Sequence, residues 1–177
     1  MDFDISETKK NLQTAYLKES GAYNEYTYYA EQAKEEGFEQ IYNTFNTFAH
    51  NEQEHAKIWF KLWHGISSTE DNLKDAMDLE NYERSVMYAD FSRKAREEGF
   101  DDIAALFDGV AAIERAHEER YKTFLNNVKN KTVFSSPKEV NWICLNCGHV
   151  HKGTTPPEKC PVCSHPQAYF MIQLGQN

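Results

Sequence analysis

Two Glu-x-x-His motifs carry the clearest chemistry in the sequence, Glu52–His55 and Glu114–His117. A spacing of three residues places the carboxylate and the imidazole on one face of an α-helix, about one turn apart. Two such pairs, with further carboxylates from two other helices, are the ligand set of a di-iron or di-manganese centre inside a four-helix bundle. The spacing therefore predicts a two-metal site held by helices.

Apolar residues at helical spacing predict the helices that position these motifs. Asp4 and Glu7 predict a capping-box start for the first helix, and Gly37 predicts its left-handed end after Glu36. The second helix is expected to end at His64 and Gly65. Its bundle-facing stripe consists of Ile41, Phe45, Phe48, Glu52, His55, Trp59 and Leu62.

The second half of the helical region repeats the first half at a shift of 62 residues. The segment 33–38 (AKEEGF) becomes 95–100 (AREEGF), and Tyr26 becomes Tyr88. The repeated stripe consists of Ile103, Phe107, Val110, Glu114, His117, Tyr121 and Phe124. Two copies of one helical hairpin imply a pseudo-twofold axis, on which a two-metal site can lie.

The repeat loses its register at one place in the third helix. Glu19 maps to Asn81, but the carboxylates stand at Glu80 and Glu83. Glu19 and Tyr26 are seven residues apart, whereas Glu80 and Tyr88 are eight apart. One additional residue in a turn is a π-bulge, a rare feature that tends to occur at functional sites. We therefore predict a π-bulge at 83–87.

Seven candidate ligands follow for the bundle site: Glu19, Glu52, His55, Glu80, Glu83, Glu114 and His117. Clustered carboxylates would repel one another unless cations neutralised them, and oxygen donors with a few imidazoles suit iron or manganese. The alternative is that these are ordinary surface glutamates beside incidental histidines. Tyr26 and Tyr88 could donate hydrogen bonds that orient the carboxylates, or they could be core tyrosines. We expect core positions for Phe45, Phe48, Trp59, Phe107 and Phe124, and surface positions for His50 and His64.

The C-terminal region carries a second metal signal. Cys144 and Cys147 form one C-x-x-C pair and Cys160 and Cys163 another, with twelve residues between the pairs. Four thiolates at this spacing form a tetrahedral cage. The ligands leave iron, a one-electron carrier, and zinc, a structural ion, both open. Short strands are predicted at 140–143 and 169–172, and so small a module must depend on its metal for stability.

The predicted fold class is an all-α four-helix bundle with a small, mainly β, metal domain. The expected divisions are a bundle at 1–130, a linker at 131–139 and the metal domain at 140–177. A net charge of −9 argues against nucleic acid or an anionic membrane surface as partners. No apolar run is long enough to span a membrane, and the acidic start is unlike a signal peptide, so we expect a cytoplasmic protein.

With these motifs the chain resembles rubrerythrin over nearly its whole length. The resemblance implies an all-α ferritin-like four-helix bundle followed by a small, mainly β, rubredoxin-like domain. The resemblance is carried by the segments 18–20 (KES), 26–28 (YTY), 52–57 (EQEHAK), 80–83 (ENYE), 114–118 (ERAHE) and 144–166, with Tyr88. It implies that Glu52 and Glu114 bridge two iron ions and that Glu19 and Glu80 are terminal ligands. His117 would bind one iron ion. The other iron ion would exchange its ligand, with Glu83 bound in the oxidised state and His55 in the reduced state.

The resemblance also implies an activity, which is the reduction of hydrogen peroxide to water. Electrons would arrive through one iron in the four-cysteine site, where zinc is the substitute, from a separate NAD(P)H-dependent reductase or a rubredoxin. His149 departs from the tyrosine that the family often has at this position. Two alternatives are an iron-oxidising storage protein and a structural zinc-ribbon interaction protein.

The connection between the second and third helices predicts the assembly. In a ferritin-like bundle these helices run parallel, so the connection must travel back along the bundle by roughly 33 Å. About five residues reach only ~17 Å. Either the third helix begins late, near Met77, or hairpin 6–64 pairs with 70–129 of a second chain. We favour the domain-swapped homodimer, with higher oligomers left open.

Overall fold

The computed structural model describes residues 2–173 of the chain, in two units that divide between Ser67 and Ser68 and are considered separately. Met1 and residues 174–177, which the predicted domains 1–130 and 140–177 include, lie outside the described residues. The predicted fold class is confirmed: long helices are followed by a small antiparallel sheet. No helix among residues 2–173 is both long enough and apolar enough to cross a membrane.

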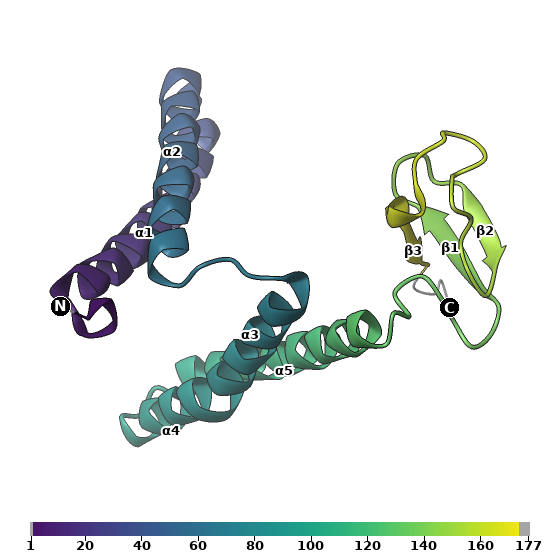
Figure 1. The fold of residues 1–177 in the computed structure, drawn as a ribbon. Helices are drawn as coiled ribbons and strands as arrows, with labels where there is room; N and C mark the ends of the chain where they lie inside the picture. The colour runs from purple at the N-terminus through teal and green to yellow at the C-terminus, as the bar shows by residue number, and fades with distance from the viewer. Residues whose placement is uncertain (1, 174–177) are drawn as a thin grey trace. The chain divides into compact units, whose positions relative to one another are not determined.

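The first unit is a helical hairpin in which α1 (Glu7–Glu35) packs against α2 (Glu39–Trp63), as Figure 1 shows. A short 3₁₀ turn, η1 (Phe3–Ile5), precedes it. The predicted cap at Asp4 is wrong. The backbone N–H of Ser6 donates a hydrogen bond to the carbonyl of Phe3 and ends η1. Ser6, with an extended backbone, is therefore the N-cap residue of α1. Its hydroxyl accepts the backbone N–H of Lys9 at 3.1 Å.

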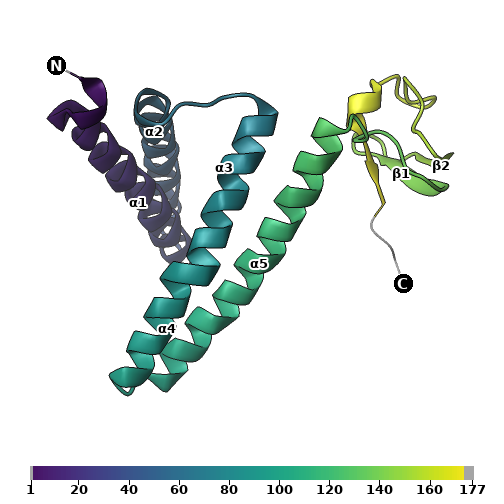
Figure 2. The ribbon, with the colours of Figure 1, turned by 60° about the horizontal axis from the view of Figure 1, so that its bottom comes forward.

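The second unit begins with a helical hairpin whose first arm changes its helix type. The arm consists of α3 (Thr69–Tyr82), the π-helical turn η2 (Glu83–Met87) and α4 (Tyr88–Glu97), which follow one another without a break. It runs beside α5 (Asp101–Lys129), as Figure 2 shows. The predicted π-bulge is therefore confirmed. Its i+5 bonding is seen where the backbone N–H of Tyr88 donates to the carbonyl of Glu83.

The third helix starts early in the sequence. The Ser68 hydroxyl accepts the backbone N–H of Asp71 at 3.1 Å and caps α3, which begins at Thr69. The alternative start near Met77 is therefore wrong. Since α2 ends at Trp63, only residues 64–68 connect α2 and α3.

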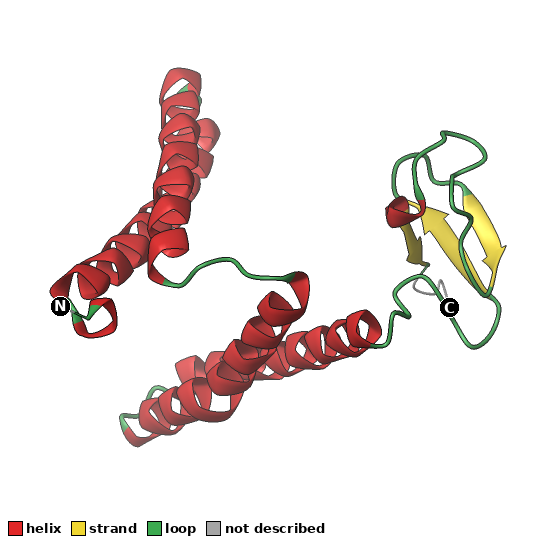
Figure 3. Ribbon diagram, viewed as in Figure 1, coloured by secondary structure: helices red, strands yellow, loops and turns green. Residues whose placement is uncertain are grey.

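The tail is a small sheet of β1 (Val140–Cys144), β2 (Val150–Gly153) and β3 (Phe170–Ile172). The order of these strands within the described residues is β2-β1-β3, all antiparallel, as Figure 3 shows. The 3₁₀ turn η3 (Gln167–Tyr169) takes the residue predicted to begin the last strand, and β2 was not predicted.

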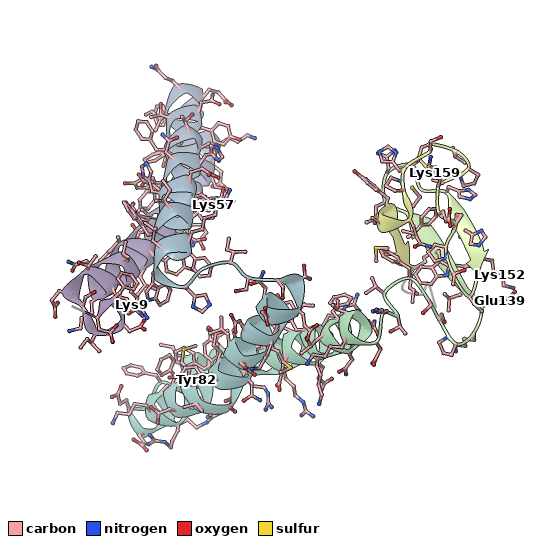
Figure 4. The ribbon with its side chains drawn as sticks, viewed as in Figure 1. Lys9, Lys57, Tyr82, Glu139, Lys152 and Lys159 are labelled. Carbon is pink, nitrogen blue, oxygen red and sulfur yellow. The ribbon has the colours of Figure 1, made fainter. Side chains whose placement is uncertain are left out.

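The buried core of the tail consists of Trp142, Cys144, Cys160 and Phe170, so two of the four cysteines are themselves core residues. The Trp142 indole N–H donates to the carbonyl of Gly153 at 3.0 Å, which ties β1 to β2. At the surface, Lys152 Nζ lies 3.7 Å from Glu139 Oε2, and both side chains are labelled in Figure 4.

The two hairpins bury mainly small residues between their helices, including Ala30, Ala33, Ala49, Ala95 and Ala104. Of the predicted core residues, Phe48 and Phe124 are 50% and 41% exposed in the single chain. Two packed helices enclose only the side chains that point between them. The stripe that carries the predicted ligands therefore remains partly open on each hairpin.

Candidate metal centres

The first hairpin gathers three of the predicted ligands into one triad. Glu19 comes from α1, and Glu52 and His55 come from successive turns of α2. One ligand atom from each lies within 4.8 Å of the others. His55 Nδ1 is 3.0 Å from Glu52 Oε2, as the Glu-x-x-His spacing predicts. This arrangement can hold one metal ion with two carboxylates and an imidazole.

The second hairpin forms the matching triad from Glu80 of α3 and from Glu114 and His117 of α5. His117 Nδ1 lies 2.8 Å from Glu114 Oε2 and 3.6 Å from Glu80 Oε1. The sequence repeat therefore extends to side-chain geometry, because each hairpin pairs one glutamate of its first arm with a Glu-x-x-His of its second.

The carboxylates of both triads are placed where cations would stabilise them. In the first triad, a hydrogen bond with Glu52 and then burial raise the pKa of Glu19. The same hydrogen bond, followed by that from His55, lowers the pKa of Glu52. The opposite directions of the two shifts show that the two carboxyl groups interact directly. A bound cation would offset the repulsion between their negative charges, which fits a metal site.

In the second triad, burial and then the hydrogen bond and charge of Glu114 raise the pKa of Glu80. The buried Oε2 atom of Glu80 has no hydrogen-bond partner among residues 2–173. Since a buried carboxylate oxygen without a partner is costly, this atom is free to bind a cation. With oxygen and imidazole donors only, both triads fit iron or manganese.

Glu83 and Tyr88 stand at the two ends of the π-helical turn. Within the described chain Glu83 belongs to neither triad, although its charge acts on Glu80. Burial, followed by the charges of Glu83, Glu114 and Glu80, raises the pKa of Tyr88, so its hydroxyl lies near the carboxylates. Its ring packs against Phe107, with ring centroids 6.0 Å apart.

Tyr26 occupies the related position in the first hairpin. Its ring packs against Phe45 of α2, with ring centroids 6.1 Å apart. Neither Tyr26 nor Tyr88 makes a hydrogen bond to a triad carboxylate among the described residues. Both tyrosines therefore pack against an aromatic residue of the second helix of their own hairpin.

The four cysteines come together in the tail from two turns with the same backbone bonds. Cys144 N donates to His149 O, and Cys160 N donates to His165 O, both at 2.8 Å. The sulfurs pair across the two turns, with Cys144 Sγ 3.7 Å from Cys163 Sγ and Cys147 Sγ 3.6 Å from Cys160 Sγ. All four are free thiols.

The ionisation of this cluster fits a tetrathiolate metal site. The N–H of His165 leads the effects that lower the pKa of Cys163 to about 6. The N–H of His149 lowers the pKa of Cys147, but burial and the neighbouring sulfurs outweigh it and raise that pKa to about 12. Thiolates this close cannot all ionise without a cation, and a tetrahedral iron or zinc ion is bound by such a set.

The sequence analysis assigned no site role to Asn81, Arg84 and Glu118, which lie beside the second triad. The Glu118 carboxylate accepts hydrogen bonds from the side chains of both Asn81 and Arg84. These two bonds, with Arg84 first, lower the pKa of Glu118. The repeat contained a signal, because Glu118 replaces Ala56 of the first hairpin.

Two carboxylate–histidine triads on repeated hairpins, followed by a tetrathiolate module, define a helical two-metal protein with an attached thiolate metal domain. Family models match accordingly: that for rubrerythrin covers residues 10–125, and that for the rubrerythrin rubredoxin-like domain covers 142–171. The chain belongs to the rubrerythrin family. It is therefore a di-iron protein, with a glutamate and histidine site in the bundle and a four-cysteine site for one iron, and its family consists of iron-dependent oxidoreductases.

Curated relatives resemble the chain over almost its full length. Rubrerythrin of Nitratidesulfovibrio vulgaris is 42% identical, with 97% of this chain and 96% of the relative covered. Rubrerythrin of Porphyromonas gingivalis is also 42% identical, with coverage of 93% and 89%. A putative rubrerythrin of Methanocaldococcus jannaschii is 40% identical, with coverage of 96% and 94%.

Proposed function

We propose that this protein is a peroxidase that reduces hydrogen peroxide to water in defence against oxidative stress. The observation that carries the proposal is the presence, in one chain, of two matching triads and a four-thiol site. Reduction of one peroxide molecule takes two electrons and two protons and yields two water molecules. A pair of metal sites suits the two-electron step, and a one-electron thiolate site suits the resupply of electrons.

The triad residues would hold the two iron ions of the bundle. When bound, these ions supply the two electrons that O–O cleavage requires. Glu52 and Glu114 are proposed as the bridging ligands, with Glu19 and Glu80 as terminal ligands. Because carboxylate and imidazole ligands bind metal in their deprotonated forms, metal affinity should rise with pH.

The remaining site residues are proposed to adjust this centre during turnover. Glu83 stands outside the second triad, so its carboxylate is available to bind or leave a metal ion, and His55 is proposed to bind when Glu83 does not. His117 would be a constant ligand. Tyr26 and Tyr88 are proposed to orient carboxylates once metal is bound.

Electrons are proposed to enter through an iron ion held by Cys144, Cys147, Cys160 and Cys163. The donor would be a separate NAD(P)H-dependent reductase or a rubredoxin. The division at 1–130, 131–139 and 140–177 and the cytoplasmic location remain predictions.

The proposed functional unit is a domain-swapped homodimer. At about 1.5 Å per residue, Glu52 lies ~16 Å from the end of α2 at Trp63, and Glu80 lies ~16 Å from the start of α3 at Thr69. If the two helices run parallel with the ligands level, residues 64–68 must cover ~33 Å, but six Cα steps reach only ~21 Å. The open stripes, with Phe48 and Phe124 exposed, provide the apolar faces that pairing would cover.

Rapid mixing of the reduced, iron-loaded protein with hydrogen peroxide or with dioxygen tests the activity. We expect the thiolate-to-iron absorption to recolour faster with peroxide, with water as the product. Glu83→Ala should slow the peroxide reaction but leave the colour of the oxidised four-cysteine site unchanged. Faster oxidation by dioxygen with deposition of many iron ions per chain would indicate storage instead. A colourless protein with zinc in the four-cysteine site would indicate a structural zinc ribbon.

A further inference from the structure

The carboxylate of Glu118 on α5 binds the third-helix arm on both sides of Glu83. Arg84 Nε donates to Glu118 Oε2 at 2.5 Å, and Asn81 Nδ2 donates to Glu118 Oε1 at 2.9 Å. The side chains of Arg84 and Glu118 are only 32% and 18% exposed. A charge-assisted pair that is mostly shielded from water is stronger than an exposed one, so this contact can fix the backbone from which its donors arise.

The same position in the first hairpin has no such contact. At the repeat shift of 62 residues, Glu118 corresponds to Ala56, which is buried against α1. The arm beside Ala56 is the uninterrupted α-helix α1, whereas the arm beside Glu118 contains the π-helical turn η2. Two departures from the repeat, an additional residue and a carboxylate in place of a methyl group, therefore meet in space.

The π-helical turn needs a partner because its bonding is less favourable than that of an α-helix. The backbone N–H of Tyr88 reaches Glu83 O across five residues, whereas a regular helix would bond Tyr88 to Arg84. A change to that regular pattern would rotate Tyr88 by about 100° relative to Glu83. Glu80, Glu83 and Tyr88 could then no longer face the same side of the arm.

We infer that Asn81, Arg84 and Glu118 form a clamp that holds the π-helical register and thereby positions Glu83. The three are positioning residues, since they act through the backbone of the turn. The part that concerns Glu83 as a metal ligand rests on the proposed function. The part that concerns the helical register does not, so the two can fail separately.

Amide hydrogen exchange of the full-length, iron-loaded protein tests the register. In Glu118→Ala, which copies Ala56, we expect exchange at 83–88 to rise by about tenfold or more while α1 and α2 are unchanged. Glu118→Gln keeps an oxygen that can accept from Arg84, so it should restore part of the protection. Glu119→Ala is the matched control, because Glu119 is 67% exposed on the same helix and forms its ion pair with Arg115.

Mössbauer spectra of the same oxidised proteins test the position of Glu83. Glu118→Ala should change the bundle-iron spectrum in the direction that Glu83→Ala does, and Glu119→Ala should not. The clamp is overturned if exchange at 83–88 is the same in Glu118→Ala and Glu119→Ala. It is also overturned as a positioning device if Glu83→Ala changes the spectrum and Glu118→Ala does not. If Glu83→Ala itself leaves the spectrum unchanged, Glu83 is not a ligand and the proposed function is wrong at that residue. The amide hydrogen exchange at 83–88 still decides whether the clamp holds the π-helical register.

Discussion

Gly37 and Gly99, related by the repeat, close the two hairpins with the same left-handed turn. Their φ angles are 82° and 84°. In each turn the glycine N–H bonds to the carbonyl three residues back at 3.1 Å, and the next N–H bonds to the carbonyl five residues back at 2.8 Å. This pair of bonds is the Schellman motif, in which a residue without a Cβ avoids strain.

Gly99→Ala should therefore destabilise the protein by about 1 kcal/mol, since alanine is strained at this φ. Gly109→Ala is the matched control. Gly109 lies inside α5, and an added Cβ there would meet nothing within 4 Å, so this change should stabilise by up to ~1 kcal/mol. Chemical denaturation of both variants measures the difference. Equal effects of the two substitutions would contradict the role of Gly99.

Removal of one triad carboxylate should remove metal from the bundle alone. We expect Glu52→Ala or Glu114→Ala to reduce bundle iron from about two ions per chain to at most one, because each triad has only three donors. Iron in the four-cysteine site should be unaffected, which elemental analysis and the thiolate absorption will show. Glu54→Ala is the control, because its side chain is half exposed and forms an ion pair with Lys57. Equal iron loss in the control would count against the triads.

The metal-free protein should become less stable relative to Glu80→Gln as pH rises. Burial and then Glu114 raise the folded-state pKa of Glu80 above its ordinary value of 4.5. The folded state therefore favours the protonated carboxyl group of Glu80. The stabilisation that results is fully present below pH 4.5 and is lost as the pH rises through the folded-state pKa.

Chemical denaturation of wild type and Glu80→Gln, both without metal, measures this loss of stability as the pH rises from below 4.5. Iron loading should abolish it in wild type, because the cation favours the ionised carboxylate. Glu25→Gln, at an exposed position of α1, serves as the control. A wild-type stability that stays parallel to that of Glu80→Gln at every pH would disprove the expectation.

Loss of metal from the tail should unfold the tail while the hairpins keep their helices. Cys144 and Cys160 are core residues as well as ligands, so little apolar core remains without the ion. In Cys160→Ser we expect rapid exchange of the Trp142 indole N–H, followed by NMR, with unchanged helical circular dichroism. Val162→Ala, at an exposed position between Cys160 and Cys163, should preserve the protection of this proton.

A longer connection should convert the proposed domain-swapped dimer into a monomer. Insertion of about twelve Gly and Ser residues after Gly65 would allow the chain to span ~33 Å, so both hairpins of one chain could pair. Solution scattering and ultracentrifugation should show a dimer for wild type and a compact monomer for the insertion variant. A compact monomeric bundle in wild type would rule out the swap.

The sequence alone determined the features that depend on local spacing. Glu-x-x-His places its two ligands on adjacent turns whatever surrounds the helix, and the repeat shows that this happens twice. The extra residue between Glu80 and Tyr88 predicted the π-helical turn, since helical periodicity permits few other ways to keep both residues on one face. The C-x-x-C pairs likewise predicted the four-thiol cluster.

Tertiary structure decided what depends on contacts between elements. The 3₁₀ turn before α1 moved the cap from Asp4 to Ser6, and backbone pairing with β1 created β2, whose sequence carries no strong strand signal. Packing within each hairpin left Phe48 and Phe124 exposed, because two helices alone cannot cover the stripe that carries the metal ligands. Only the packing of α3 against α5 showed that Glu80 joins a triad while Glu83 does not. The same packing placed Glu118 against Arg84, a long-range contact that no local pattern of the sequence encodes.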